Sequence, residues 1–240
     1  MIGAFLNALG ILLGAWFGLA WPRPLALRAQ VFLRSALGAF TVFFGLRLGW
    51  ENLAGDLASG LKQLLAAGLA LVLGNGIGKL LALQKISNRL GRHAASRLAA
   101  AHKHPPGPPA DGVMTGMILF CAAPLGLIGA VTDGLSDFYY LLAVKAVMDA
   151  LAAMSFAQTF RWPAALAAFP VYFFLNGLTR AVHFGALPWL AAHALTEVVN
   201  LTAGLLACTL ALVIFEVRRV ELANYLPALA VAPLLAWLAR

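Results

Sequence analysis

The sequence predicts an all-α protein, a single domain over residues 1–240 that is built as a polytopic bundle of seven to eight transmembrane helices. Two observations carry this prediction. Hydrophobic residues make up 62% of the chain and charged residues only 11%, and the mean hydropathy is +0.87, far above that of soluble domains. Apolar stretches long enough to cross a bilayer as helices recur along the whole chain. They lie at about 2–20, 31–50, 61–83, 112–132, 138–160, 163–183, 189–215 and 223–239.

The first and the last apolar stretch limit the number of spans. No Lys or Arg precedes the apolar core of 2–20, so we interpret this segment as the first span and not as a cleaved signal peptide. The last stretch, 223–239, is short and contains Pro227 and Pro233, so it is expected to tilt, break or re-enter the membrane if it does not span. We therefore expect seven or eight spans.

The positive charges predict how the chain is oriented. The net charge is +8, but the basic residues flank apolar segments and form no stripe with aromatic residues, which argues against a nucleic-acid partner. By the positive-inside rule, the basic connection 84–111 lies in the cytoplasm, and the acidic connection at Asp133 and Asp137 lies outside. We expect a multi-pass protein of the bacterial inner membrane with its amino terminus outside. The basic residues expected on the cytoplasmic side are Arg23, Arg28, Lys79, Lys85, Arg89, Arg92, Arg97, Lys103, Arg161, Arg218 and Arg219.

The cytoplasmic connection 84–111 has two parts. Ile86, Leu90, Ala94 and Leu98 recur every four residues, with basic residues on the other face, which predicts an amphipathic helix at the membrane interface. Anionic lipid is the partner expected for the basic face. The second part, "HKHPPGPPAD", is interpreted as a Pro-rich linker whose two histidines are solvated.

Weak internal similarity predicts a repeat. Asn75-Gly76 in the third stretch and Asn176-Gly177 in the sixth are each followed by an aliphatic residue and, two positions after that residue, a basic one, and the second and fifth stretches carry Arg34 and Lys145. Because the similar segments keep the same order, we expect two three-span units in an inverted repeat, as in many secondary transporters. The alternative is chance similarity among Gly- and Leu-rich segments. The predicted units are 1–83 and 112–184, joined by 84–111 and followed by C-terminal spans in 185–240.

Motifs in the fourth and fifth stretches resemble those of a bacterial family. "LFCAAPLGLIGAVTDG" (119–134) has the Leu-Phe-Cys, the later Gly and the Asp-Gly of that family, and "KAVMDA" is similar to its Lys-Ser-x-x-Asp-Gly. Asn7 and the segment "LANYLPA" (222–228) match its two ends. On these motifs the chain resembles the uncharacterised inner-membrane proteins of the YqgA/YdfK type, a family of unknown function. The resemblance covers nearly the whole chain, and it implies the fold and the location rather than a substrate.

Some residues depart from the pattern of that family. Lys79 and Thr132 stand where the family has acidic residues, Asn176 lies near an expected Gln or Glu, and Ala123 and Ala150 replace Gly. The ligand chemistry of the family is therefore not carried over to these positions.

Lys145 and Asp149 are the charged residues expected in the middle of a span. Each costs about 2.5 to 3.5 kcal/mol to insert at the bilayer centre. Their i, i+4 spacing puts them on one helical face, where they can form an ion pair, and both are expected to face the bundle interior. One reading is an ion or solute pathway, and the other is a buried pair that only locks helix packing.

Further polar residues in the spans could complete a polar cavity near the bilayer midplane. Each Asn taken alone is also explained by interhelical hydrogen bonding, Asp133 by a solvated turn, and Arg34 by snorkelling to the interface. Gln158 and Thr159 near the cytoplasmic end of the fifth span are expected to line an exit. The full predicted pathway comprises Lys145, Asp149, Asn7, Asn75, Asn176, Glu197, Asn200, Asp133 and Arg34.

The sequence is compatible with three functions. The first is a transporter or channel for a small ion or polar solute, the second a structural or regulatory membrane protein, and the third an intramembrane enzyme. Metalloprotease and serine-nucleophile motifs are missing from the sequence, so we expect no enzyme, no metal and no cofactor. Cys121 and Cys208 are expected to be packing residues. The oligomeric state stays open, and a homo-oligomer is compatible with the sequence.

Overall fold

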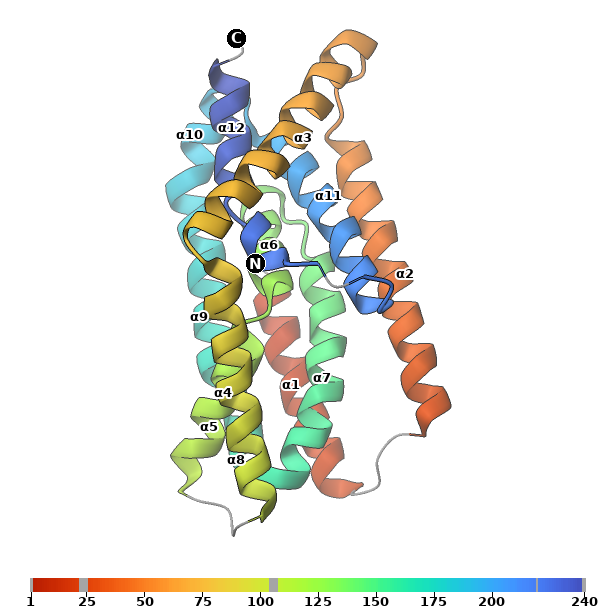
Figure 1. Cartoon of the computed structure of the whole chain (residues 1–240), viewed down its shortest axis with the longest axis vertical. Helices are drawn as coiled ribbons and strands as arrows, with labels where there is room; N and C mark the ends of the chain where they lie inside the picture. The colour runs from red at the N-terminus through yellow and green to blue at the C-terminus, as the bar shows by residue number, and fades with distance from the viewer. Residues whose placement is uncertain (1, 22–25, 104–107, 219, 239–240) are drawn as a thin grey trace.

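The computed structural model describes residues 2–21, 26–103, 108–218 and 220–238, and these ranges fold into helices and turns without a strand (Figure 1). The predicted all-α class is therefore confirmed. The expectations for Arg23, Arg219 and the side chains of His102 and His104 lie outside the described residues. In chain order the elements are α1 (Ile2–Ala20), α2 (Leu27–Glu51), α3 (Leu57–Leu80), α4 (Leu83–Lys103), α5 (Pro109–Cys121), α6 (Pro124–Ser136), α7 (Tyr140–Phe160), α8 (Pro163–Leu166), α9 (Ala168–Ala181), the π-helical turn η1 (Val182–Ala186), α10 (Leu187–Ala192), α11 (Thr196–Ile214), the 3-10 turn η2 (Leu222–Tyr225) and α12 (Ala228–Leu238).

The described residues contain six helical segments that are long and apolar enough to cross a membrane: α1, α2, α3, α7, Pro163–Ala192 and α11. The pair α5 and α6 passes the same criterion only jointly and is bent by 67°, the geometry of a broken span or of a re-entrant segment. The last apolar segment, Leu222–Leu238, is shorter than a span. The predicted helical bundle is confirmed with six to seven candidate spans among the described residues, and an eighth full crossing stays a prediction.

The fourth span is not the continuous helix expected at 112–132. It breaks at Ala122 and Ala123, where the backbone of Ala123 is extended. The cause is Pro124, which has no amide hydrogen and disfavours helical conformation in the residue before it. Because proline is well tolerated in a first helical turn, Pro124 then starts α6.

The expected boundary between the sixth and seventh spans is also wrong. The helical run that starts at Pro163 continues beyond 183 through the π-helical turn to Ala192, and α11 starts only at Thr196 instead of 189. The chain turns at Ala194, which has a positive φ of 46°. Continuous apolar residues prolong the sixth span, and periodicity alone could not locate this turn.

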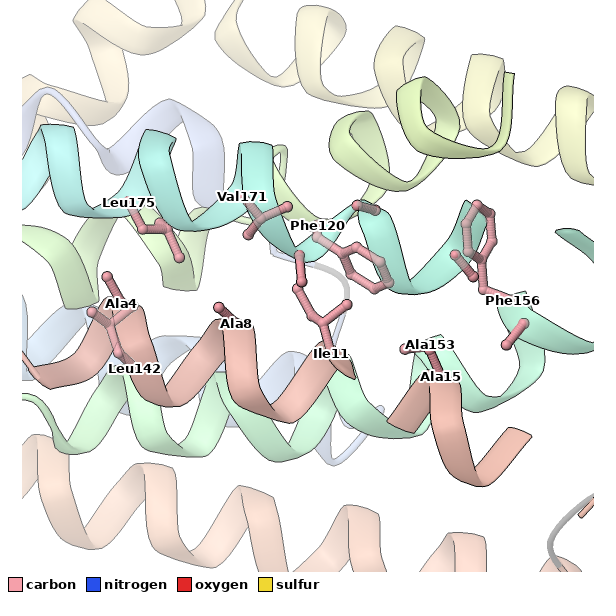
Figure 2. Close-up of a cluster of buried hydrophobic side chains, with 14 of the residues drawn as sticks. Ala4, Ala8, Ile11, Ala15, Phe120, Leu142, Ala153, Phe156, Val171 and Leu175 are labelled. Atoms are coloured by element: carbon pink, nitrogen blue, oxygen red, sulfur yellow. The ribbon is translucent and has the colours of Figure 1, made fainter. Parts of the chain in front are cut away.

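The tightest helix contact joins α1 and α7, which pack along most of their lengths. On α1, Gly10, Gly14 and Gly18 lie one turn apart, and a Cβ on Gly10 or Gly14 would collide with the backbone of Ala146 or Ala150 on α7. Small residues at four-residue spacing let membrane helices approach closely. The adjacent core contains Ile11, Phe120, Phe156 and Leu175 (Figure 2).

Two further pairs complete the bundle. α2 packs along α11, where Gly45 faces the backbone of Gly204, and α3 packs against η2 and α12, where Gly74 faces Ala228. Large apolar side chains on α2 and α3 remain exposed, such as Phe32 at 71% and Val72 at 68%. Such an exposed apolar surface is expected where helices face lipid.

The predicted amphipathic helix exists as α4, but its apolar face does not all point to lipid. Ala94 is buried, and Leu98 packs against the core cluster, whereas Ile86 and Leu90 are exposed. Arg97 also contacts Asp111 of α5 at 3.3 Å. The end of α4 therefore docks on the protein.

The predicted inverted repeat stays a prediction. Its counterparts, α3 and α9, make different contacts, since α3 packs on η2 and α12 and α9 packs on α1 and α6.

Candidate intramembrane polar site

Lys145 and Asp149 lie on the buried face of α7. The Lys145 Nζ and the Asp149 Oδ2 form an ion pair, with side chains that are 1% and 10% exposed. The helix that carries them is rich in Leu, Ala, Val and Met, which tolerate an apolar environment, and its Leu, Ala and Met favour helical conformation. The expectation that both residues face the bundle interior is confirmed.

The break between α5 and α6 supplies a second partner for Lys145. Its Nζ donates a hydrogen bond of 2.8 Å to the carbonyl oxygen of Phe120 in the last turn of α5. The last carbonyls of a helix have no partner within that helix, and the helix dipole makes this end negative. The ammonium of Lys145 therefore lies between the carboxyl end of α5 and the Asp149 carboxylate, and both favour a cation.

Gly126 in the first turn of α6 makes room for the same side chain. A Cβ built on Gly126 would lie 2.8 Å from Cε of Lys145. The close approach of the α6 backbone therefore favours glycine at this position, and both sides of the break enclose Lys145.

Asn7 of α1 holds the other end of the ion pair. Its Nδ2 donates a hydrogen bond of 2.8 Å to Asp149 Oδ2, which thereby accepts from both Asn7 and Lys145. Asn7 is fully buried, and its Oδ1 has no hydrogen-bond partner among the described residues. The Gly contacts between α1 and α7 bring Asn7 within reach of Asp149.

The surroundings of the site are apolar. Leu142, Phe120 and Phe156 are almost fully buried next to it, and they belong to the core cluster drawn in Figure 2. Because few mobile dipoles surround it, the ion pair is stronger than in water, and either charge would be strongly disfavoured without its partner.

Most of the other predicted pathway residues lie elsewhere, so the expected single ring of polar residues does not form from the described residues. Asn200 donates to Asn52 at 3.0 Å, and the exposed Glu197 accepts from Gln63 at 3.2 Å, so these two belong to the far end of α11. Their arrangement shows that equal polarity in the sequence need not mean a shared site. Individual roles in a pathway stay predictions.

Asp133 is fully buried in α6 and is not in the solvated turn considered from the sequence. A Cβ built on Gly3 would lie 3.1 Å from Asp133 Oδ2 and 2.5 Å from Leu142, so Asp133 lies beside Leu142, about one turn of α1 from Asn7.

The other three predicted residues occupy separate surroundings. Asn75 and Asn176 are half-buried on α3 and α9. Arg34 forms an ion pair with Glu216 at the surface, with side chains 48% and 70% exposed.

Arg34 also lines a cavity of about 310 Å³ between α2, α7 and the end of α11. Gln30, Ser155 and Gln158 contribute its other polar groups, and Met148 and Leu151 contribute part of its apolar wall. Gln158 thus lines a cavity, and its place at an exit stays a prediction. Lys145 and Asp149 are not among the residues that line this cavity.

Sequence reasoning missed the Phe120 carbonyl and Gly126. A backbone carbonyl has no sequence signature of its own, but Pro124 within an apolar stretch was the signal for a break that exposes such groups.

The fold and the site define a polytopic α-helical membrane protein with a buried ion pair at a broken span. The chain belongs to the family described as "Protein of unknown function (DUF554)", which matches residues 2–237. It is 27% identical over 233 residues to "Uncharacterized protein YqgA" of Escherichia coli (strain K12) and 22% identical over 244 residues to "Uncharacterized membrane protein YdfK" of Bacillus subtilis (strain 168). Each comparison covers 97% of this chain and 94% of the relative. No solved structure gives a significant match.

Proposed function

We propose that this integral membrane protein transports a small ion or polar solute through the site formed by Lys145, Asp149, Asn7 and the break between α5 and α6. The observation that carries the proposal is the position of the Lys145 ammonium between the Phe120 carbonyl and the Asp149 carboxylate. Broken helices whose ends face a site near the membrane midplane are a recurring basis of ion and solute binding in secondary transporters.

Lys145 acts in this proposal as a tethered cation. Its ammonium balances the Asp149 carboxylate and the negative end of α5 while the site is empty. A solute that binds the ammonium weakens its contact with Asp149, and a proton or cation can then take its place at the carboxylate. The ion pair thus couples the binding of the solute to the charge state of Asp149, with no chemical reaction and no enzymatic activity.

The proposed location is the bacterial inner membrane, with the amino terminus outside and α4 on the cytoplasmic side. The ends of α1, α4 and α7 and the start of α5 lie together at the lower end of the molecule in Figure 1. Their neighbouring basic residues support one cytoplasmic end under the positive-inside rule. The lipid bilayer, with anionic lipid at the basic face of α4, stays the proposed environment.

Flux in proteoliposomes tests the proposal. Purified protein is reconstituted, gradients of Na⁺, K⁺, chloride, phosphate and acetate are imposed in turn, and the uptake of each ion is followed. We expect flux of at least one ion, which falls to the level of protein-free vesicles in Asp149→Asn and Lys145→Met.

Glu51→Gln is the matched control. Glu51 forms an ion pair with Arg47 at the same i, i+4 spacing on the exposed surface of α2, and flux should persist when that pair is broken. Absence of flux for all of these ions, or flux that Asp149→Asn leaves unchanged, would contradict the proposal.

A structural role is the second candidate, and the near-complete burial of Lys145 favours it. The double variant Lys145→Met/Asp149→Leu separates the two. Since both charges are removed together, the helix packing should survive. If flux also survives, then the ion pair has only a structural role.

A further inference from the structure

An open surface cavity of about 450 Å³ lies between α4 and the break that separates α5 from α6. Ser87, Asn88 and Arg92 line it from α4, and Ala122, Ala123 and Pro124 line it from the break. One of these residues, Arg92, belongs to the basic face that the sequence assigned to lipid contact. This part of α4 therefore faces the break between α5 and α6.

The same break separates this cavity from Lys145. The Phe120 carbonyl, two residues before Ala122, holds the Lys145 Nζ at 2.8 Å, and Gly126, two residues after Pro124, contacts the side chain of Lys145. The backbone from 120 to 126 is thus the wall between the cavity and the buried ammonium.

The cavity is lined by hydrogen-bond donors and a positive charge. Ser87 offers a hydroxyl group and Arg92 a guanidinium group. Asn88 Oδ1 accepts a hydrogen bond of 3.0 Å from Gln84, so the donor end of the Asn88 amide points away from Gln84. Among the described residues that line the cavity there is no Asp or Glu, and this set of groups fits an anion.

The carboxyl-terminal segment fixes the turn of α4 that forms the cavity. Asn224 Oδ1 accepts from the backbone N–H of Gln84 at 3.0 Å, and the backbone N–H of Ala223 donates to Gln84 Oε1 at 3.1 Å. The reciprocal bonds hold Gln84, which in turn holds Asn88. The segment "LANYLPA" thereby has a physical role, because it sets the start of α4 against the broken span.

We infer that this cavity is the entry site for a small anion, such as an inorganic anion or a short carboxylate, on the α4 side of the protein. Arg92 attracts the anion, Ser87 and Asn88 donate hydrogen bonds to it, and the ammonium of Lys145 lies behind the backbone wall. The inference deepens the proposed function by naming the substrate class, and it rests on that function for passage beyond the wall. Binding in the cavity does not require transport.

A thiol introduced in place of the Ser87 hydroxyl measures the charge selectivity of the cavity directly. Ser87→Cys is placed in a Cys121→Ala/Cys208→Ala chain, reconstituted in neutral phosphatidylcholine vesicles, and reacted with anionic 2-sulfonatoethyl methanethiosulfonate or its cationic trimethylammonioethyl analogue. After each rate is divided by the rate of the same reagent with a free thiol, we expect the anionic reagent to react about tenfold faster than the cationic one, because Arg92 lines the same cavity. Inorganic phosphate should slow the reaction of the introduced thiol in a saturable way.

Arg92→Gln should abolish both the charge preference and the protection by phosphate. Arg89→Gln is the matched control, since it removes one positive charge from the same helix without changing the cavity lining, and it should leave both in place. Equal rates for the two reagents, or a preference that Arg92→Gln leaves unchanged, would overturn the inference. Protection only in vesicles that contain phosphatidylglycerol would assign the site to a lipid headgroup and would also overturn it.

The inference and the proposed function can fail separately. Protection by phosphate without flux of any tested ion would leave the cavity as an anion site and refute transport. Flux restricted to Na⁺ or K⁺, with a cavity that prefers the cationic reagent, would keep transport and refute the anion site.

Discussion

Two ion pairs in this molecule have the same spacing but different surroundings. Lys145 and Asp149 on α7 are almost fully buried, whereas Arg47 and Glu51 on α2 have side chains 42% and 44% exposed. The inner pair has further partners in Asn7 and the Phe120 carbonyl, and the outer pair has Arg47 stacked 5.1 Å from the Tyr140 ring. A spacing of four residues therefore predicts a pair but does not predict what the pair does.

The difference lies in what happens when one partner is lost. At an exposed position, water replaces the missing partner, and long side chains reorient freely. At the inner position no water takes that role, so a remaining charge would have to be neutralised or moved. A buried pair of this kind is costly to keep, which gives a physical reason to expect a function for it and makes its loss easy to measure.

Removal of one carboxylate from each pair should show the largest contrast. We expect Asp149→Leu to lower the free energy of unfolding by about 3–5 kcal/mol, because it leaves Lys145 buried without a counter-charge. Glu51→Leu should change it little. SDS-induced unfolding in mixed micelles, followed by circular dichroism, measures both.

Restoring charge balance sharpens this contrast. The double variant Lys145→Met/Asp149→Leu should recover most of the stability lost in Asp149→Leu, because no unpaired charge remains. If Asp149→Leu were as stable as Glu51→Leu, then the inner pair would be solvated and the described burial would not govern its energetics.

The close contact of α1 with α7 is the second way to test the comparison, because it closes the inner site. A Cβ on Gly14 would collide with the backbone carbonyl of Ala150, which has no flexible end to move aside. We therefore expect Gly14→Ala to destabilise by about 1–3 kcal/mol, and to weaken the hydrogen bond of Asn7 to Asp149 by separating the helices. The same SDS titration gives the change in stability.

Gly68→Ala is the matched control for this prediction. A Cβ on Gly68 of α3 meets nothing within 4 Å, so alanine should leave stability unchanged or raise it by up to about 1 kcal/mol through its higher helix propensity. Equal effects at Gly14 and Gly68 would mean that the α1–α7 approach is looser than described.

The sequence was sufficient to predict the class of fold and the ion pair of the site. Composition and apolar length predict helices in a bilayer, and two opposite charges four residues apart in such a helix must face inward. These inferences hold because they depend on the large cost of placing polar groups in lipid.

The rest depends on tertiary contacts that local patterns do not contain. The hydrophobic pattern around Asn7 does not distinguish it from Asn200, yet one reaches Asp149 and the other Asn52, because the partner depends on which helices pack together. The Phe120 carbonyl became a ligand only through the break at Pro124. The prediction of one polar ring failed because it assumed that polar residues in different spans share one depth and one face.

The smallest expected effect on stability concerns the exposed carboxylate of Asp56, which accepts a hydrogen bond from a backbone N–H and is a simpler case than either ion pair. Asp56 caps the start of α3, and the hydrogen bond from the backbone N–H of Ser59 at 2.9 Å lowers the pKa of Asp56 below its ordinary value of 3.8. A lowered folded-state pKa contributes stability that is present above 3.8 and is lost as the pH falls through the folded value. Asp56→Asn keeps a capping acceptor but cannot titrate, so melting curves of the two proteins should converge as the pH falls below 3.8. A constant difference between them from neutral pH to the acid limit would mean that the cap does not depend on the charge of Asp56.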